Sequence, residues 1–155
     1  MMVVTIHAAS LSGFSNLSPD MDISLTNTGS LDWAIWDANS DTAFAEKVTT
    51  NIKSGGPGVI SSITAVAGDG SVRGASDGLQ TFTYVDGVSP TSQFNSTIGM
   101  TINNSLGSIG PGVQLSVTGD SSLMYQVDIW TTGFRSVGEM TASLNGADDV
   151  VLYTD

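Results

Sequence analysis

The chain contains no cysteine, so neither a disulfide nor a thiolate metal site can hold it together. Basic residues are almost as scarce, because Lys and Arg together number 4 against 15 acidic residues, and the formal net charge is −11. This charge repels phosphate backbones and anionic lipid, so we expect neither nucleic-acid binding nor membrane binding. Stability must come from packing, or from assembly with copies of the same chain.

Long apolar runs are missing too. No segment approaches the roughly 18 to 20 apolar residues that span a bilayer. The first nine residues have no Lys or Arg before a short apolar run, which is unlike a signal peptide and typical of a first strand. We therefore expect a protein made for the cytoplasm, or for a particle that is assembled there.

Residues for catalysis are few. His7 is the only histidine, so at most one histidine can serve as a base, and Glu46 and Glu139 are the only glutamates. Several aspartates sit beside Gly or Ser, where turns are expected rather than paired catalytic carboxylates. We interpret His7 as structural or solvent-facing, and we predict that the protein is not an enzyme and has no catalytic residues.

Acidic side chains are the one plentiful ligand type, and hard cations need only oxygen ligands. The candidates are Asp69, Asp77 and Asp86 in consecutive loops, and the adjacent pair Asp148 and Asp149. None of them matches the calcium-loop pattern of alternating Asp or Asn followed by Gly and a distal Glu. The metal ligands therefore stay unassigned, a structural calcium ion stays open, and no other cofactor is expected.

The composition favours β-structure. The 155 residues fit one domain, residues 1–155, with 40% hydrophobic and only 12% charged residues. Alternating apolar residues, bounded by Gly, Asn, Asp and Ser, recur along the chain. They predict strands within residues 1–9, 22–26, 30–37, 59–66, 79–85, 97–103, 113–117, 123–131, 140–144 and 150–153.

The remaining segments are predicted to be turns and loops. We expect loops over residues 10–21 and 54–58, a polar connection over residues 68–78, and turns at residues 86–87, 110–112 and 145–146. Residues 41–48 carry the one helical hint, with Asp41 as N-cap. The pattern predicts an all-β fold: a two-sheet antiparallel β-sandwich that is jelly-roll-like.

Two of the three tryptophans lie in one stretch, residues 30–37. Strand alternation places Trp33 and Ile35 on one face and Trp36 on the other. The two indoles therefore cannot form one platform. We expect Trp33 to anchor the core, and Trp36 to be the tryptophan that is free for a partner.

Short blocks of the chain resemble a bacterial β-sandwich module. The blocks are residues 30–36, 53–55 with 60–61, 82–87, 129–130 and 141–146. The module runs roughly as Gly-Thr-x-Asp-Trp-x-x-Trp, Phe-Ser-Trp-x-Asp-Gly-Thr-Pro and Ala-Ser-Leu-Ser-Asp-Gly. It occurs in secreted and cell-surface proteins, and is similar to galactose-binding or carbohydrate-binding jelly rolls. This chain has Tyr84 where the module usually has Trp, and Asn145 where it usually has Ser-Asp.

An exposed aromatic ring with polar neighbours is the usual platform for a sugar. Trp36 and Trp130 are the candidate rings, with Asp37, Asp128 and Asn39 as hydrogen-bonding neighbours. The simpler interpretation, which we favour, is that both indoles are buried.

Together these features predict a non-enzymatic structural or interaction module. We expect a decoration or cement protein on the surface of a larger assembly such as a phage capsid, and hence on the virion surface. Its partners would be the shell or copies of itself. The alternative is a carbohydrate-binding module that binds a glycan outside the cell or at the cell surface.

Overall fold

The computed structural model describes most of the chain. The described residues are 2–7, 10–15, 22–38, 48–66, 71–75, 80–96, 99–103, 112–120, 122–130, 138–144 and 150–154. They form strands and one four-residue helix, which confirms the all-β prediction. The two-sheet sandwich and the single domain stay predictions. None of the described helices is long and apolar enough to cross a membrane.

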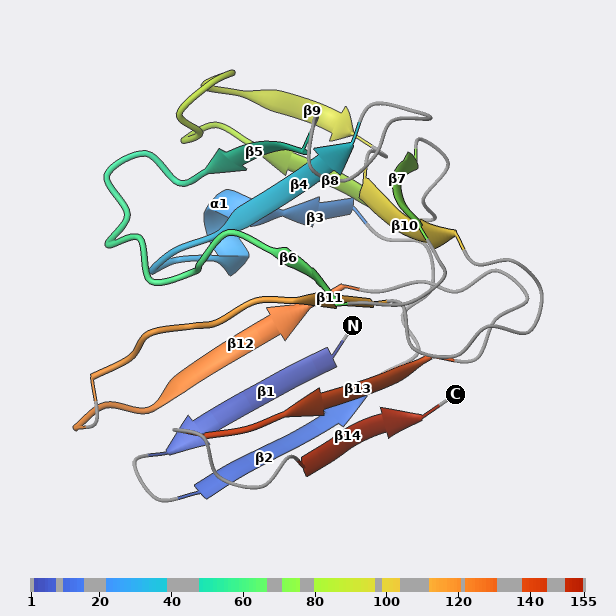
Figure 1. Cartoon of the computed structure of the whole chain (residues 1–155). Coiled ribbons are helices and arrows are strands. Elements are labelled where there is room, and N and C mark those ends of the chain that lie inside the picture. The colour runs from blue at the N-terminus through green and yellow to red at the C-terminus, as the bar shows by residue number, and fades with distance from the viewer. Residues whose placement is uncertain are drawn as a thin grey trace. The chain divides into compact units, whose positions relative to one another are not determined.

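The chain divides into two compact units, residues 1–19 with 119–155 and residues 20–118. The first unit contains β1 (Met2–His7), β2 (Ser10–Ser15), β12 (Tyr125–Ile129), β13 (Glu139–Ala142) and β14 (Val150–Thr154). Its antiparallel pairs give the order β12-β1-β2 and a second sheet of β13 and β14 (Figure 1). The unit thus joins strands from both ends of the chain.

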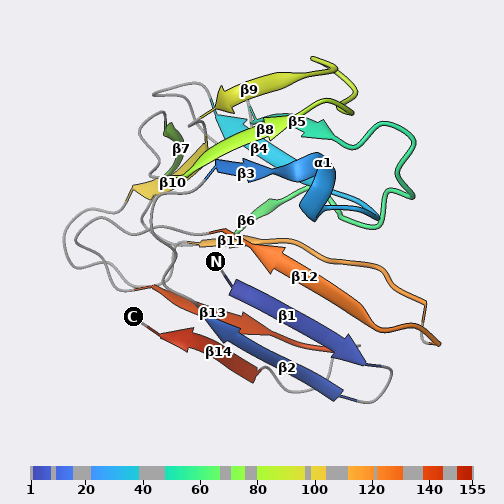
Figure 2. The ribbon, with the colours of Figure 1, turned by 180° about the vertical axis from the view of Figure 1, so that it is seen from behind.

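The second unit contains the remaining elements. They are β3 (Asp22–Ser24), α1 (Leu25–Thr28), β4 (Ala34–Ala38), β5 (Val48–Ile52), β6 (Thr64–Val66), β7 (Ser71–Ala75), β8 (Thr81–Tyr84), β9 (Gln93–Ser96), β10 (Gly99–Asn103) and β11 (Gly112–Gln114). Three antiparallel pairs join β4 to β5, β7 to β10 and β6 to β11. A further sheet has the order β3-β8-β9, and its three strands lie side by side in both views (Figures 1 and 2).

One strand pair differs from the predicted antiparallel pattern. β3 pairs parallel to β8, with Asp22 opposite Thr81. A parallel neighbour needs a long crossover, and the chain supplies it because β4 to β7 lie between the two strands in the sequence. The sheet is therefore mixed.

The predicted strand over residues 22–26 ends early. Leu25 is buried, and residues 25–28 coil into the single turn of α1. The Gly29 N–H donates to the Leu25 carbonyl at 2.8 Å and closes this turn. A Cβ at Gly29 would lie 2.7 Å from Cβ of Trp33, so the chain passes here at a distance that only glycine allows.

Other predicted boundaries are corrected in part. Residues 10–15, expected in a loop, form β2, and residues 71–75, expected in a polar connection, form β7. Only β6, the last part of residues 59–66, is a strand. β5 and β9 are not among the predicted strands. Val48 begins β5, whereas residues 41–47 of the predicted helix and the turn at 145–146 lie outside the described residues.

The described core lies in the second unit. The buried apolar side chains are Ile23, Leu25, Trp33, Ile63 and Tyr84. Trp33 is 4% exposed, and its ring lies 4.7 Å from that of Tyr84, centroid to centroid. The prediction that Trp33 anchors the core is confirmed.

Candidate functional site: a braced turn beside Trp33

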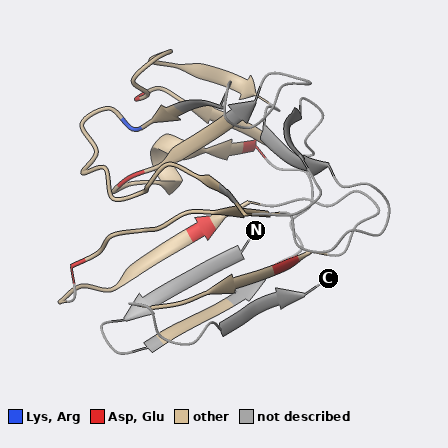
Figure 3. Cartoon of the chain, in the orientation of Figure 1, with Lys and Arg blue, Asp and Glu red and all other residues tan. Residues whose placement is uncertain are grey.

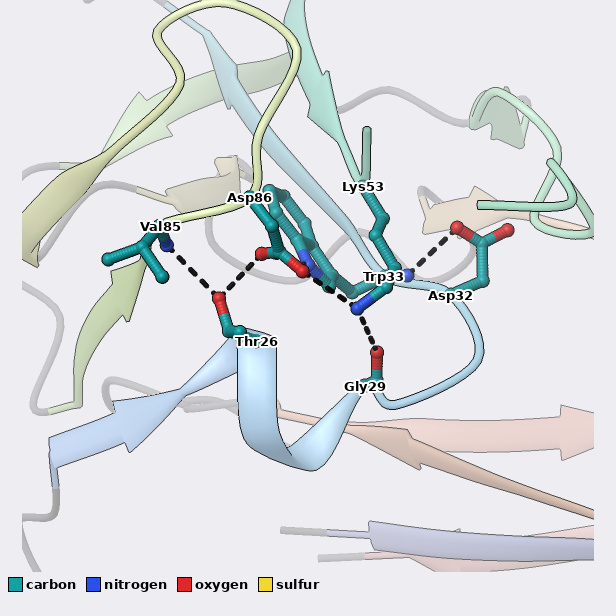
Figure 4. Close-up of polar contacts among 7 residues, drawn as sticks. All are labelled: Thr26, Gly29, Asp32, Trp33, Lys53, Val85 and Asp86. Atoms are coloured by element: carbon teal, nitrogen blue, oxygen red, sulfur yellow. Dashed lines mark hydrogen bonds and ion pairs between the residues drawn. The ribbon is translucent and has the colours of Figure 1, made fainter. Parts of the chain in front are cut away.

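Three segments that are distant in the sequence meet at the Trp33 indole. They are residues 26–33 around α1, Lys53 directly after β5, and residues 85–87 directly after β8. Figure 4 shows Thr26, Trp33 and Lys53 directed toward Asp86, and the Val85 side chain directed away from it. The turn over residues 85–92, which joins β8 to β9, is therefore held from its inner side.

The Asp86 carboxylate is the centre of this contact. Lys53 Nζ lies 2.7 Å from Oδ2, whereas Thr26 Oγ1 at 2.5 Å and Trp33 Nε1 at 3.1 Å both donate to Oδ1. Lys53 Nζ also donates to the Gly29 carbonyl at 3.2 Å. Both carboxylate oxygens have donors, and the buried indole N–H has its acceptor.

This arrangement shifts the acidity of Asp86. Partial desolvation alone raises the pKa of Asp86, but hydrogen bonds from Lys53, Thr26 and Trp33, together with the Lys53 charge, outweigh it. The pKa of Asp86 therefore lies below its ordinary value, and the carboxylate is ionised at neutral pH.

Asn51 holds the same turn further along. Its Nδ2 donates to Tyr84 Oη at 2.7 Å and to the Pro90 carbonyl at 2.9 Å. Its Oδ1 accepts from the N–H groups of Ile52 and Val88, each at 3.0 Å, and of Ser89 at 3.2 Å. Asn51 is buried, and its side chain makes five hydrogen bonds to groups of the turn and its support.

Asp32 anchors a second loop in a similar way. Its Oδ1 accepts from the Trp33 N–H at 3.0 Å, and its Oδ2 accepts from the Val59 N–H at 2.8 Å. A Cβ at Gly56 would lie 2.7 Å from Oδ1. The loop over residues 54–58, predicted from its Gly and Pro content, is thus fixed against Trp33.

Two exposed apolar side chains lie beside these structural hydrogen bonds. Val88 lies opposite Ile52, because the Val88 N–H donates to the Ile52 carbonyl at 3.1 Å and the preceding pair, Lys53 and Gly87, forms an antiparallel bridge. Val88 is 55% exposed, and Ile52 is exposed as well. We call these two side chains the Ile52–Val88 patch.

The four residues predicted to bind a ligand lie in different units. Trp36 is half-buried in β4, and its indole Nε1 is buried with no hydrogen-bond partner among the described residues. Asp37 follows it in β4, and its side chain lies outside the described part, as does Asn39. In the other unit, Asp128 accepts from Gln126 Nε2 at 3.0 Å, and Trp130 is half-buried after β12. A role for these residues in ligand binding stays a prediction.

The candidate metal ligands are only partly described. Asp69, Asp77, Asp148 and Asp149 lie outside the described residues, and Asp86 is paired with Lys53. Within the described part, no three His, Cys, Asp or Glu side chains gather as a metal site would require. A structural calcium ion stays a prediction.

Sequence reasoning did not assign Lys53 and Asn51 to a site. One signal was available for Lys53, because it is one of only four basic residues in a chain with 15 acidic ones. Asn51 gave no signal, since four of its five partners lie 33 to 39 residues away in the sequence. The blocks 30–36, 53–55 and 82–87, which carry the resemblance to the bacterial module, contain residues that meet here.

No family model matches the chain, no curated protein matches it, and no solved structure matches it.

Proposed function

We propose that the chain is a non-enzymatic interaction module that decorates or cements the surface of a larger protein assembly, such as a phage capsid. The observation that carries the proposal is the turn over residues 85–92, which is braced from inside and exposes the Ile52–Val88 patch. On this proposal the protein is located on the virion surface.

The bracing supports a docking role. Asp86 and Asn51 fix the backbone of the turn through the hydrogen bonds described above, so little conformational entropy remains to be lost when a partner binds. Polar groups that already hydrogen-bond to other groups of the protein are also poorly suited to catalysis. The exposed Val88 and Ile52 side chains offer apolar area that a partner can cover.

The charge supports a protein shell as the partner. A net charge of −11 attracts a basic surface over long range, while the uncharged patch supplies the close contact. Binding that combines the charge attraction with the apolar contact should be saturable. It should weaken as salt screens the attraction.

The test is co-sedimentation with empty shells assembled from the major shell protein encoded nearest to this chain. Val88→Asp introduces a charge into the patch. Leu123→Asp is the matched control, because Leu123 is 56% exposed and lies in the other unit. We expect saturable binding by the wild type and by Leu123→Asp, and a loss of about tenfold or more in Val88→Asp. Circular dichroism and urea unfolding verify that both variants are folded.

Three results would overturn the proposal. They are no sedimentation of the wild type with the shells, equal loss in both variants, or saturable binding on a glycan array that Trp36→Ala or Trp130→Ala abolishes with the fold intact. The last result would establish the carbohydrate-binding alternative.

A further inference from the structure

The outer face of β8 and β9 is a second exposed surface, distinct from the Ile52–Val88 patch. Phe82 pairs with Ser96 and Tyr84 with Gln93, so Phe94 and Asn95 both lie opposite Thr83. Two residues opposite one define a β-bulge, and Asn95 has a φ of 51°. Tyr84 faces the core, so Thr83 and its two partners face outward.

Two large apolar side chains lie on this face. Phe94 is 64% exposed, the highest value among the described large apolar side chains. Val85 is 58% exposed and is the next outward position after Thr83, two residues along the chain. We call Thr83, Val85 and Phe94 the outer β8–β9 face.

This face carries no charge on a strongly acidic protein. No charged residue occurs over residues 87–119, and the Asp86 carboxylate is turned inward to Lys53. In Figure 3 the ribbons of β8 and β9 are free of red and blue. A basic partner would therefore gain no ion pairs from this face.

A second copy of the chain is the occupant that this charge distribution fits. Two chains with a net charge of −11 repel each other, and they approach with least repulsion where neither presents a carboxylate. We propose that two copies associate through their outer β8–β9 faces, with Phe94 of each copy packed on Val85 of the other. The same patch then serves both chains, as a two-fold contact requires.

The structure of β9 favours contact through the outer β8–β9 face over edge-to-edge strand pairing. β9 has four residues, and its bulge at Asn95 interrupts the ladder that another strand would have to extend. Short, bulged strands are a common protection against pairing at a sheet edge. The apolar side chains, rather than the backbone groups, are therefore the contact.

Salt separates this association from binding to a basic shell. Screening weakens the repulsion between two acidic chains, so self-association should strengthen as salt rises. Binding to a basic shell should weaken over the same range. The inference does not rest on the proposed function. A chain that dimerises without binding shells would support the dimer and contradict the proposed function.

The test is sedimentation equilibrium of the full chain over a concentration series, at about 0.05, 0.15 and 0.5 M NaCl. We expect a monomer–dimer equilibrium that shifts toward dimer as salt rises. Phe94→Asp and the milder Phe94→Ser should weaken the dimer by about tenfold or more. Met124→Asp and Met124→Ser are the matched controls, because Met124 is 62% exposed and lies in the other unit.

The result that supports the inference is loss of dimer in the Phe94 variants alone, with all four variants folded by circular dichroism. A chain that stays monomeric at every concentration and salt would overturn it. Equal loss in the Phe94 and Met124 variants, or dissociation as salt rises, would overturn it as well.

Discussion

The Lys53 ammonium lies 2.7 Å from the Asp86 carboxylate, although 33 residues separate the two in the sequence. The pair is half-buried, and Asp86 also accepts from Thr26 and Trp33. One carboxylate thus joins α1, the core tryptophan, the end of β5 and the turn after β8. The predictions below test how much of the second unit depends on this contact.

Asp86→Asn should lower the free energy of unfolding. The amide keeps one oxygen acceptor, but it loses the charge that holds Lys53 and leaves a half-buried ammonium without a counter-ion. We expect a loss of roughly 1 to 3 kcal/mol, in the lower part of that range because solvent reaches the pair. Urea unfolding at pH 7 measures it. Glu139→Gln, at an exposed position in β13, is the control and should change little. Equal midpoints for Asp86→Asn and wild type would contradict the account.

The contribution of Asp86 to the free energy of unfolding should disappear in acid. Because the pKa of Asp86 is lower in the folded chain than in the unfolded chain, the stabilisation is complete above the unfolded pKa of about 3.9 and is lost as the pH falls through the folded value. The wild type should therefore exceed Asp86→Asn by a constant amount between about pH 5 and 7, and by less below about pH 4.

Asp120 also contributes to the pH dependence of stability over the same acid range. The Ser122 hydroxyl and N–H donate to its carboxylate and outweigh the slight desolvation, so the pKa of Asp120 is lowered. Its contribution is common to wild type and Asp86→Asn, and it cancels in their difference. A difference that stays constant down to pH 3, or that grows in acid, would refute the assignment to Asp86.

Gly87→Ala should destabilise the turn by overpacking. A Cβ at Gly87 would lie 2.6 Å from the Pro90 carbonyl oxygen, 2.7 Å from Tyr84 Cε2 and 2.8 Å from Asn51 Nδ2. We expect a cost of roughly 1 to 3 kcal/mol in thermal or urea unfolding. At Gly138 nothing lies within 4 Å of the same Cβ, so Gly138→Ala is the matched control and should be close to neutral. Similar costs at both positions would show that close packing is not the cause.

Asn51→Ala should cost more than any other single change proposed here. It removes the hydrogen bonds of Asn51 to the Pro90 carbonyl, the Ser89 N–H and the Tyr84 hydroxyl in a half-buried region, whereas the Val88 N–H keeps the Ile52 carbonyl. We expect a loss of roughly 2 to 4 kcal/mol. Tyr84→Phe removes one of the five contacts and should cost about 1 kcal/mol. Asn27→Ala, on the exposed side of α1, is the control. A smaller loss in Asn51→Ala than in Tyr84→Phe would be inconsistent with the network.

The β-rich fold and the burial of Trp33 could be predicted from local patterns, because alternation and a tryptophan-rich stretch are readable over a few residues. β2, β7 and β9 could not. β9 has one large apolar residue in four, and β2 is half serine, so their strand conformation depends on pairing with β8 and β1.

The braced turn was predictable only as a turn. The Asp-Gly pair at residues 86–87 indicates the bend, but nothing in the sequence indicates that the carboxylate is directed inward to Lys53. The parallel pairing of β3 with β8, which brings α1 beside this turn, is equally invisible to local patterns. Long-range contacts of this kind determine which residues meet at the site.

Hydrogen exchange with and without bound shells tests the docking role of the turn most directly. The account predicts that shells slow exchange at the amides of residues 85–92 and 52–54, and that Val88→Asp removes this protection while Leu123→Asp preserves it. Protection confined to the first unit, or unchanged exchange at residues 85–92 on shells that retain the chain, would contradict it.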